Sequence, residues 1–206
     1  MSLRLWLPAL LLALAATAFA GGEAADSGVR GRLAEPPVLR GQFEQRKQLQ
    51  GFRNPLVSRG DFLLVRERGV AWDTREPFAS SAVLTRERLL TELPDGSRRV
   101  VLDAQSSPGM AAVNPLLMAL VAGDLQALAP QFETRETLLP EGSWRLVLVP
   151  REAGLKRVFA RIELRGDRHV REVDIEETGG DRSTIRFIDL RDVPATASAE
   201  EAARFD

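Results

Sequence analysis

Cysteine is missing from the chain, and histidine occurs once, at His169. Without cysteine the protein can form no disulfide and no thiolate metal site, and it has no cysteine nucleophile. One imidazole cannot build a two-histidine metal site, and any serine–histidine arrangement would have to use it. The fixed motifs of hydrolase elbows, P-loops and dinucleotide sites are absent as well. We therefore expect a protein that is not an enzyme and that uses no cofactor or metal.

An excess of charge of one sign is also lacking. The formal net charge is −1 at pH 7 and both signs are interspersed, which gives no electrostatic footprint for nucleic acid. His169 stands beside the turn pair Gly166-Asp167, where we expect a solvated histidine at a strand end. The carboxylate pairs Glu176-Glu177 and Glu200-Glu201 are typical of solvated charge, since adjacent side chains of a strand point to opposite faces. A hydrolase that works with carboxylates alone stays open as an alternative.

The longest apolar run lies at the N-terminus. Arg4 is the only charge before the apolar residues 5–16, and Ala18-Phe19-Ala20 provides the small-x-small site that a signal peptidase reads. The run is short for a transmembrane helix. We expect residues 1–20 to be a cleaved signal peptide, with an uncleaved anchor as the alternative. Because no cysteine follows the cleavage site, the mature protein is expected to be free in the periplasm.

After the leader the chain divides into two parts. Residues 21–37 contain glycine, alanine, charges and Pro36-Pro37 without an apolar period, which indicates a flexible lead-in. Residues 38–206 are enough for one domain with its own core.

The pattern from Val38 onward is that of β-strands, with apolar residues at every second position. Turn pairs separate the strands, at Asn54-Pro55, Arg68-Gly69, Glu76-Pro77, Asp95-Gly96, Glu141-Gly142, Gly166-Asp167 and Gly179-Gly180. Buried rows are expected at Trp144, Leu146 and Leu148, at Ile162 and Leu164, and at Val173 and Ile175. The residues between them should face water: Arg145, Arg161, Glu163, Arg165, Glu172 and Asp174. One wet face and one buried face predict an antiparallel meander.

Residues 110–130 break this alternation and predict helix. Asn114 is a suitable N-cap with Pro115 at the first helical position, and Asp124 can cap a second short helix after Gly123. The apolar residues 116–122 leave no polar stripe, so the first helix must be covered on more than one side. It is either a core helix packed into the sheet or a lid over an apolar cavity.

Residues 60–73 carry a more specific pattern, Gly-Asp-Phe-Leu-Leu-Val-Arg-Glu-Arg-Gly-Val-Ala-Trp-Asp, followed by Pro77. It resembles the LolA family of periplasmic outer-membrane lipoprotein carriers. In that family a G-x-[apolar] strand runs into an arginine, and a tryptophan follows six residues later, before the next proline. Arg66 and Trp72 hold these two places. Residues 43–45, Phe-Glu-Gln, are similar to the family's F-x-Q, residues 114–118 to its lid helix, and residues 144–188 to its last strands.

Two features depart from the family pattern. Arg66 is followed by Glu67 where the family usually has proline, so Glu67 could pair with Arg66 and draw it away from the lid. The sequence also stops at Phe205-Asp206, short of the C-terminal strand and loop that help the best-known members send cargo one way. We expect a shorter relative, with a short C-terminus, whose cargo need not be a lipoprotein.

The resemblance implies a mainly β fold with some α: an unclosed antiparallel β-barrel, or curved sheet, around an apolar cavity covered by short helices. It implies a monomeric periplasmic carrier that shields the acyl chains of a lipoprotein or glycolipid. Such a carrier would take its cargo from an inner-membrane donor complex to an outer-membrane acceptor. The alternative is a lipid-sensing module of the same fold that signals to a membrane partner.

The same resemblance gives Arg66 the role of a latch that bonds to backbone carbonyls of the lid, with an ordinary outward arginine as the alternative. The expected lipid-binding set is Phe43, Phe62, Leu64, Trp72, Leu116, Met118 and Leu120. Its alternative is a dry, filled core, which is the commoner use of aromatic and methionine rows. Phe62 and Leu64 could also exchange faces with Leu63 and Val65, because a slip of one residue reverses a strand.

Overall fold

The structure is a computed structural model and describes residues 28–85, 88–92, 98–103, 119 and 124–206. The expected signal peptide lies outside these residues, and so does the first predicted helix apart from Ala119. Within the described ranges, no helix has the length and apolar character needed to cross a membrane.

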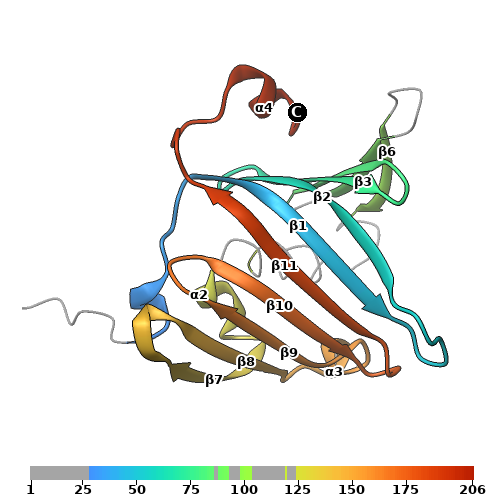
Figure 1. The fold of residues 1–206 in the computed structure, drawn as a ribbon, viewed down its shortest axis with the longest axis vertical. Helices are drawn as coiled ribbons and strands as arrows, with labels where there is room; N and C mark the ends of the chain where they lie inside the picture. The colour runs from blue at the N-terminus through green and yellow to red at the C-terminus, as the bar shows by residue number, and fades with distance from the viewer. Residues whose placement is uncertain (1–27, 86–87, 93–97, 104–118, 120–123) are drawn as a thin grey trace, which may run out of the picture.

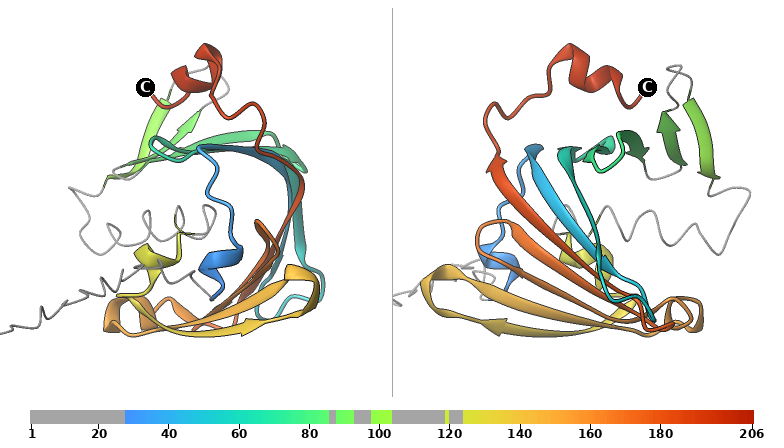
Figure 2. Two further views of the ribbon diagram at one scale, coloured as in Figure 1. Left: turned by 90° about the vertical axis from the view of Figure 1, so that its left-hand side faces the viewer. Right: turned by 45° about the vertical axis from the view of Figure 1, so that its right-hand side comes forward.

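One antiparallel sheet of 11 strands forms the body of the protein, in the order β6-β5-β4-β3-β2-β1-β11-β10-β9-β8-β7 (Figure 1). The strands are β1 (Val38–Gln48), β2 (Leu56–Val65), β3 (Gly69–Glu76), β4 (Ser80–Leu84), β5 (Arg88–Glu92), β6 (Arg98–Asp103), β7 (Phe132–Leu138), β8 (Trp144–Pro150), β9 (Phe159–Gly166), β10 (Val170–Glu177) and β11 (Arg182–Arg191). β6 and β7 are the two edges, so the sheet curves without closing (Figure 2). The predicted unclosed antiparallel sheet is confirmed.

Short helices flank the sheet: η1 (Arg30–Arg32), α2 (Leu125–Leu128), η2 (Pro140–Gly142), α3 (Ala153–Lys156) and α4 (Ala199–Ala203). Figure 2 shows η1 and α2 on the concave side of the sheet and α4 on its outer side. α2 directly follows Asp124, as the sequence predicts. α3 and α4 are additions that the alternation of apolar residues does not indicate.

The predicted turn pairs lie between consecutive strands or include a terminal strand residue, except Asp95-Gly96, which is outside the described residues. Two of the turns need left-handed backbone, which glycine adopts without strain. Gly142 has a φ of 77° and Gly180 a φ of 92°. The hairpin arrangement of the sheet therefore follows from local turn chemistry.

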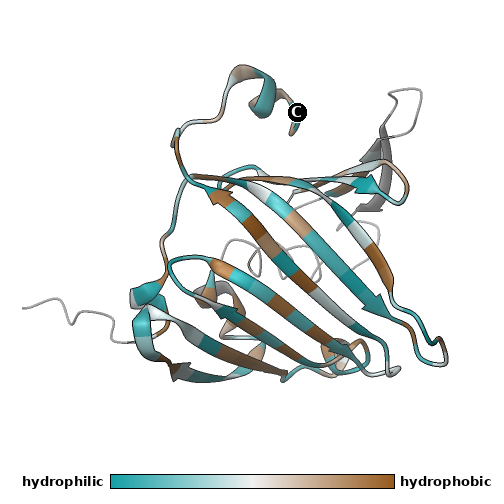
Figure 3. Ribbon diagram, viewed as in Figure 1, coloured by the Kyte–Doolittle hydropathy of each residue, from teal (hydrophilic) through white to brown (hydrophobic). Residues whose placement is uncertain are grey.

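The two faces of the sheet are both partly apolar. The rows of β8, β9 and β10 that the sequence predicts as buried are all buried and belong to one large core on the concave side. Figure 3 shows the alternation along these strands. On β2, Phe62 and Leu64 join this core, whereas Leu63 joins a second cluster on the outer face. The strand parity is thus the one that the sequence analysis favours.

The C-terminal segment covers the second cluster. Phe205, which follows α4, packs with Leu63 and with residues of β1, β3, β4 and β5: Val38, Ala71, Val83 and Leu90. Arg40 on β1 donates to both carboxylate oxygens of Glu201, at 2.6 and 2.7 Å, and Arg204 donates to Asp73 at 2.6 Å. The expectation that Glu200-Glu201 is merely solvated charge is wrong for Glu201.

Residues 28–37 differ from the flexible segment that their composition indicates. Val29 is fully buried in the concave core, and its backbone N–H donates to Glu136 Oε2 at 2.8 Å. The N–H of Ala34 donates to the carbonyl of Arg168 at 2.7 Å. One buried side chain and two backbone hydrogen bonds hold the segment against the sheet. The sequence analysis misses this because the segment has no periodic apolar pattern.

Two polar residues are buried where the sequence predicts exposure. Glu163 is only 6% exposed, because Arg145, Arg161 and Arg165 surround it and pair with its carboxylate. His169 is only 7% exposed, and its Nε2 lies 3.6 Å from Asp192 Oδ2. The prediction of a solvated histidine is wrong, since the turn that carries His169 folds back toward the chain that follows β11.

Candidate functional site

Four aromatic rings from neighbouring strands meet on the concave side, and we call them the aromatic wall: Phe43 of β1, Phe62 of β2, Trp72 of β3 and Phe187 of β11. The strand register brings them together, since Phe43 is paired with Phe187 and Phe62 with Trp72. The ring centroids of Phe43 and Trp72 are 3.8 Å apart in a stacked arrangement. Phe187 meets Phe62 edge-on at 5.1 Å.

Gly60 provides the space for this wall. It is paired with Phe43 across the β1–β2 ladder. A Cβ atom at this position would lie 2.9 Å from a ring carbon of Phe43 and 1.8 Å from the carbonyl oxygen of Asp73. The glycine of the motif is therefore required by the close approach of β3 and of the Phe43 ring.

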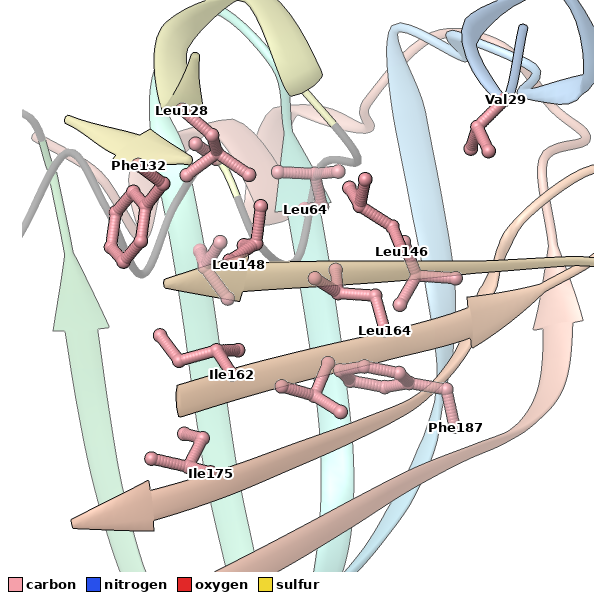
Figure 4. Close-up of a cluster of buried hydrophobic side chains, with 14 of the residues drawn as sticks. Val29, Leu64, Leu128, Phe132, Leu146, Leu148, Ile162, Leu164, Ile175 and Phe187 are labelled. Carbon is pink, nitrogen blue, oxygen red and sulfur yellow. The ribbon is translucent and has the colours of Figure 1, made fainter. Parts of the chain in front are cut away.

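Aliphatic side chains from the other half of the sheet continue the same surface, and we call them the aliphatic floor: Leu146, Leu148, Ile162, Leu164, Val173 and Ile175. Figure 4 shows members of the floor directed toward Leu64 and Phe187, with Leu128 and Phe132 above them. Val29 enters the same cluster from the N-terminal segment. The concave side is thus one apolar surface that extends across the wall and the floor.

The structure brings together four of the residues predicted to bind lipid. Phe43, Phe62 and Leu64 are buried in the concave core, and Trp72 is partly buried against it. Leu116, Met118 and Leu120 lie outside the described residues. Ala119, in the middle of the predicted lid helix, is buried in the same core.

The sequence analysis misses several members of this surface. Phe187 had a readable signal, since it alternates with polar residues along β11 two positions after Ile185. Val29, Leu128 and Phe132 carry no periodic signal strong enough to assign them to the concave side. Their position depends on where the segments before β1 and β7 cross the sheet.

Arg66 lies in the turn between β2 and β3. Its Nε donates to the carbonyl of Pro36 at 3.4 Å, and its backbone N–H donates to the carbonyl of Pro37 at 2.9 Å. The lid helix that the resemblance assigns as its partner is outside the described residues. Glu67 is exposed, and no ion pair joins it to Arg66 in the described part of the chain.

The outer face offers polar pockets of a different kind. One of 390 Å³ is lined by charged side chains around Glu163, and one of 650 Å³ lies between Arg40 and the C-terminal segment. Burial alone would raise the pKa of Glu163, but the hydrogen bond from Arg145 and the charges of Arg165 and Arg145 hold it below its usual range. These arginine–carboxylate pairs stabilise the outer surface of the sheet.

Side chains that could bind a metal or transfer a proton are sparse in the described ranges. They contain no set of three or more His, Asp or Glu residues that could hold a metal ion. Burial lowers the pKa of His169 below its ordinary value of 6.5, against the nearby Asp192, which raises it. The arrangement of the concave surface is suited to holding an apolar group without directional contacts.

Solved structures with a related arrangement share little sequence with the chain. A LolA superfamily protein from Nitrosomonas europaea is 12% identical, with a TM-score of 0.44 over 81% of this chain and 91% of that one. A DUF1329 family protein from Desulfovibrio piger is 11% identical, with a TM-score of 0.46 over 83% and 92%. A chain of the Pseudomonas aeruginosa MucA/MucB complex is 16% identical, with a TM-score of 0.41 over 84% and 60%.

Among curated proteins, none matches the chain. The model of the family described as "Outer membrane lipoprotein carrier protein LolA" matches residues 37–200. This range contains every strand of the sheet, all four rings of the aromatic wall and Arg66. The chain therefore belongs to the LolA family.

Proposed function

We propose that the protein is a periplasmic carrier that shields the acyl chains of a lipoprotein or related lipid on the concave side of its sheet. The observation that supports this proposal is the continuous apolar surface formed by the aromatic wall and the aliphatic floor. The cargo would be received at the inner membrane from a donor complex and delivered to an acceptor at the outer membrane. The carrier works as a monomer.

Acyl chains supply enough free energy for such a role. Each buried methylene contributes about 0.8 kcal/mol, so a sixteen-carbon chain would contribute roughly 12 kcal/mol if fully removed from water. Aromatic and aliphatic side chains recover this free energy without fixed contacts, which suits cargo that must later leave. Trp72 is the one ring of the wall that keeps partial exposure, so an entering chain would meet it first.

Two adjacent leucines of β2 allow a matched test. Leu64 is buried on the concave side and Leu63 on the outer face, and each is at most 5% exposed. Leu64→Ala and Leu63→Ala should both reduce the free energy of unfolding, by roughly 2–5 kcal/mol. Only Leu64→Ala should also change the affinity for a lipophilic fluorescent probe that fatty acid or lipoprotein displaces.

The result for the wild type decides the proposal. Probe binding that fatty acid displaces, with the change confined to Leu64→Ala and Trp72→Ala, supports an acyl site. If the wild-type protein binds no probe and carries no lipid when it is purified from the periplasm, the concave side is a filled core. A protein that binds lipid but never releases it to outer-membrane fractions would be a sensor instead of a carrier.

The proposed compartment requires export. Cleavage after Ala18-Phe19-Ala20 would give a mature protein that begins at Gly21, with residues 38–206 as its carrier domain. N-terminal sequencing of the protein from the periplasmic fraction should find Gly21. Retention of Met1 together with the membrane fraction would contradict this proposal and support an uncleaved anchor.

A further inference from the structure

Two large apolar side chains are mostly exposed to solvent at one end of the sheet. Phe52 is 67% exposed and Leu56 is 62% exposed, both at the turn between β1 and β2. Val158, just after α3, is 44% exposed. Large exposed apolar side chains that gather at one end of a molecule mark a candidate interaction site.

These turns belong to one continuous end of the molecule. The N–H of Gln50 donates to Asp181 Oδ1 at 2.9 Å, which ties the β1–β2 turn to the β10–β11 turn. Thr178 links the β10–β11 turn to the segment at the end of α3. Its N–H donates to the carbonyl of Val158 at 3.0 Å, and its hydroxyl donates to the carbonyl of Lys156 at 2.8 Å. Figure 1 shows the three segments gathered at the same end. We call residues 49–56, 151–158 and 177–182 the hairpin end.

The free charge of the hairpin end is positive. Four of its five basic side chains, Arg53, Arg151, Lys156 and Arg157, are exposed and form no ion pair within the described ranges. The fifth, Arg182, lies 3.8 Å from Glu176. Of the acidic ones, Glu177 and Asp181 lie 2.8 and 3.8 Å from Lys47. Glu152 is the acidic residue there without such a partner in the described chain, so four unpaired cations stand against one unpaired carboxylate.

We propose that the hairpin end binds the surface of an anionic lipid bilayer. Phe52 and Leu56 enter the interface between headgroups and acyl chains, while Arg53, Lys156 and Arg157 bind lipid phosphates. Aromatic and leucine side chains flanked by unpaired cations are the combination that binds peripheral proteins to anionic membranes. The end consists of turns that project from the sheet, a shape that a fluid lipid surface can accommodate (Figure 1). The inference does not depend on whether the concave side holds an acyl chain.

The absence of cysteine allows a direct test at single positions. Phe52→Cys, labelled with a polarity-sensitive fluorophore, reports insertion at the hairpin end. Phe78→Cys is the matched control, because Phe78 is an aromatic residue with 82% exposure in the β3–β4 turn. The cations near Phe78 are paired, Arg75 with Asp61 and Arg59 with Glu76.

The probes are vesicles of phosphatidylcholine with and without phosphatidylglycerol, added to protein recovered from the periplasm. We expect a blue shift of the label at position 52 only with anionic vesicles, and none at position 78. Equal shifts at both positions, or an equal response to neutral vesicles, would overturn the proposal. The same holds if position 52 shows no shift at all.

Affinity measurements separate the apolar and the electrostatic parts. In co-sedimentation with anionic vesicles, Phe52→Ser with Leu56→Ser should weaken binding roughly tenfold or more. Arg53→Gln and Arg157→Gln should each weaken it about fivefold and reduce its dependence on salt. All these residues are exposed, so the thermal unfolding midpoint should not change. Unchanged binding in these variants, with Phe78→Ser as the control, would refute the assignment.

Discussion

Gly60 and Gly154 illustrate how differently one residue type is used within the sheet and outside it. Gly60 lies under the Phe43 ring and against the backbone of β3, with no space for a Cβ atom. Gly154 lies in α3, where a Cβ atom would meet nothing within 4 Å. The motif glycine that carries the family resemblance is therefore a packing requirement of the aromatic wall.

Substitution of these two glycines should have opposite effects. We expect Gly60→Ala to lower the free energy of unfolding by roughly 3 kcal/mol or more, because β3 must move away from β2. Gly154→Ala should leave it unchanged or raise it by up to about 1 kcal/mol, since alanine favours helix. Urea unfolding measures both. Equal stability of the two variants would show that β3 moves away from Gly60 easily.

His169 should make stability depend on pH in a defined window. Burial lowers its pKa from 6.5, so the folded protein binds fewer protons than the unfolded chain just below that value. The contribution of the neutral imidazole is complete above pH 6.5 and is lost as the pH falls through the folded pKa. Urea unfolding between neutral pH and about pH 5 should show this loss in the wild type. His169→Gln should show a smaller slope, and an identical slope would contradict the assignment.

Substitution of Arg66 tests whether a latch controls the proposed acyl site. Hydrogen bonds of a charged group contribute about 1.5–3 kcal/mol, so Arg66→Leu should favour an open empty state by tenfold or more. The variant should load acyl chains at least as well as the wild type and release them poorly to outer-membrane fractions. Loading and release like the wild type would show that the latch role of the family does not extend to Arg66. Glu67→Pro, which restores the family's residue, is the companion variant.

At the scale of elements, the C-terminal segment behaves as a cover bound by charge. Ser198 and Glu201 form a reciprocal capping box at the start of α4. The hydrogen bond from Arg40 is the main reason that the pKa of Glu201 is lowered to about 2. Arg40 also donates to the carbonyls of Pro194 and Thr196. One arginine of β1 therefore holds both the loop before α4 and the helix itself.

Arg40→Met should release this cover while the sheet stays folded. We expect faster amide hydrogen exchange in residues 195–206, because Glu201 and two carbonyls lose their donor. Arg46→Met is the control, since Arg46 lies on the same strand and pairs with Glu44 at the surface. In the wild type the segment should stay docked above pH 4.5 and loosen as the pH falls toward 2. Exchange that is equal in both variants would contradict the role of Arg40.

The elements differ in how far the sequence predicts them. Strands bounded by Gly, Pro or Asn turn pairs are predicted well, because turn chemistry is local. The capping box of α4, Ser198 with Glu201, is a pattern that a sequence can show. The sequence analysis misses it because it treats Glu200 and Glu201 as adjacent residues of a strand. α3 is too short for its apolar residues to show a helical period. Val29 depends only on tertiary placement, which no local pattern encodes.

At the scale of the whole molecule, the candidate site arises from one pairing between distant strands. Phe43, Phe62 and Trp72 come from consecutive strands, and their common face could be predicted from alternation. Phe187 joins them because β11 pairs with β1. A pairing between the two ends of the chain has no sequence signal of its own. The sequence therefore predicts the buried rows of β8, β9 and β10 without showing that they continue the surface of the aromatic wall.

The strand order also sets how the chain can fold. Every ladder except β1–β11 joins strands that follow one another in sequence, so most loops to be closed are short. Isolated hairpins form in about 1–10 μs, whereas closure of a long loop is slower and entropically unfavourable. We expect the meanders β1–β6 and β7–β11 to form early and the β1–β11 seam to be rate-limiting. Ile185→Val on the seam and Val147→Ala in the β8–β9 hairpin should then both slow refolding and change the unfolding rate little, because both sets of contacts exist in the transition state; stopped-flow chevron plots measure both rates. Faster unfolding with unchanged refolding in Ile185→Val would contradict a rate-limiting seam.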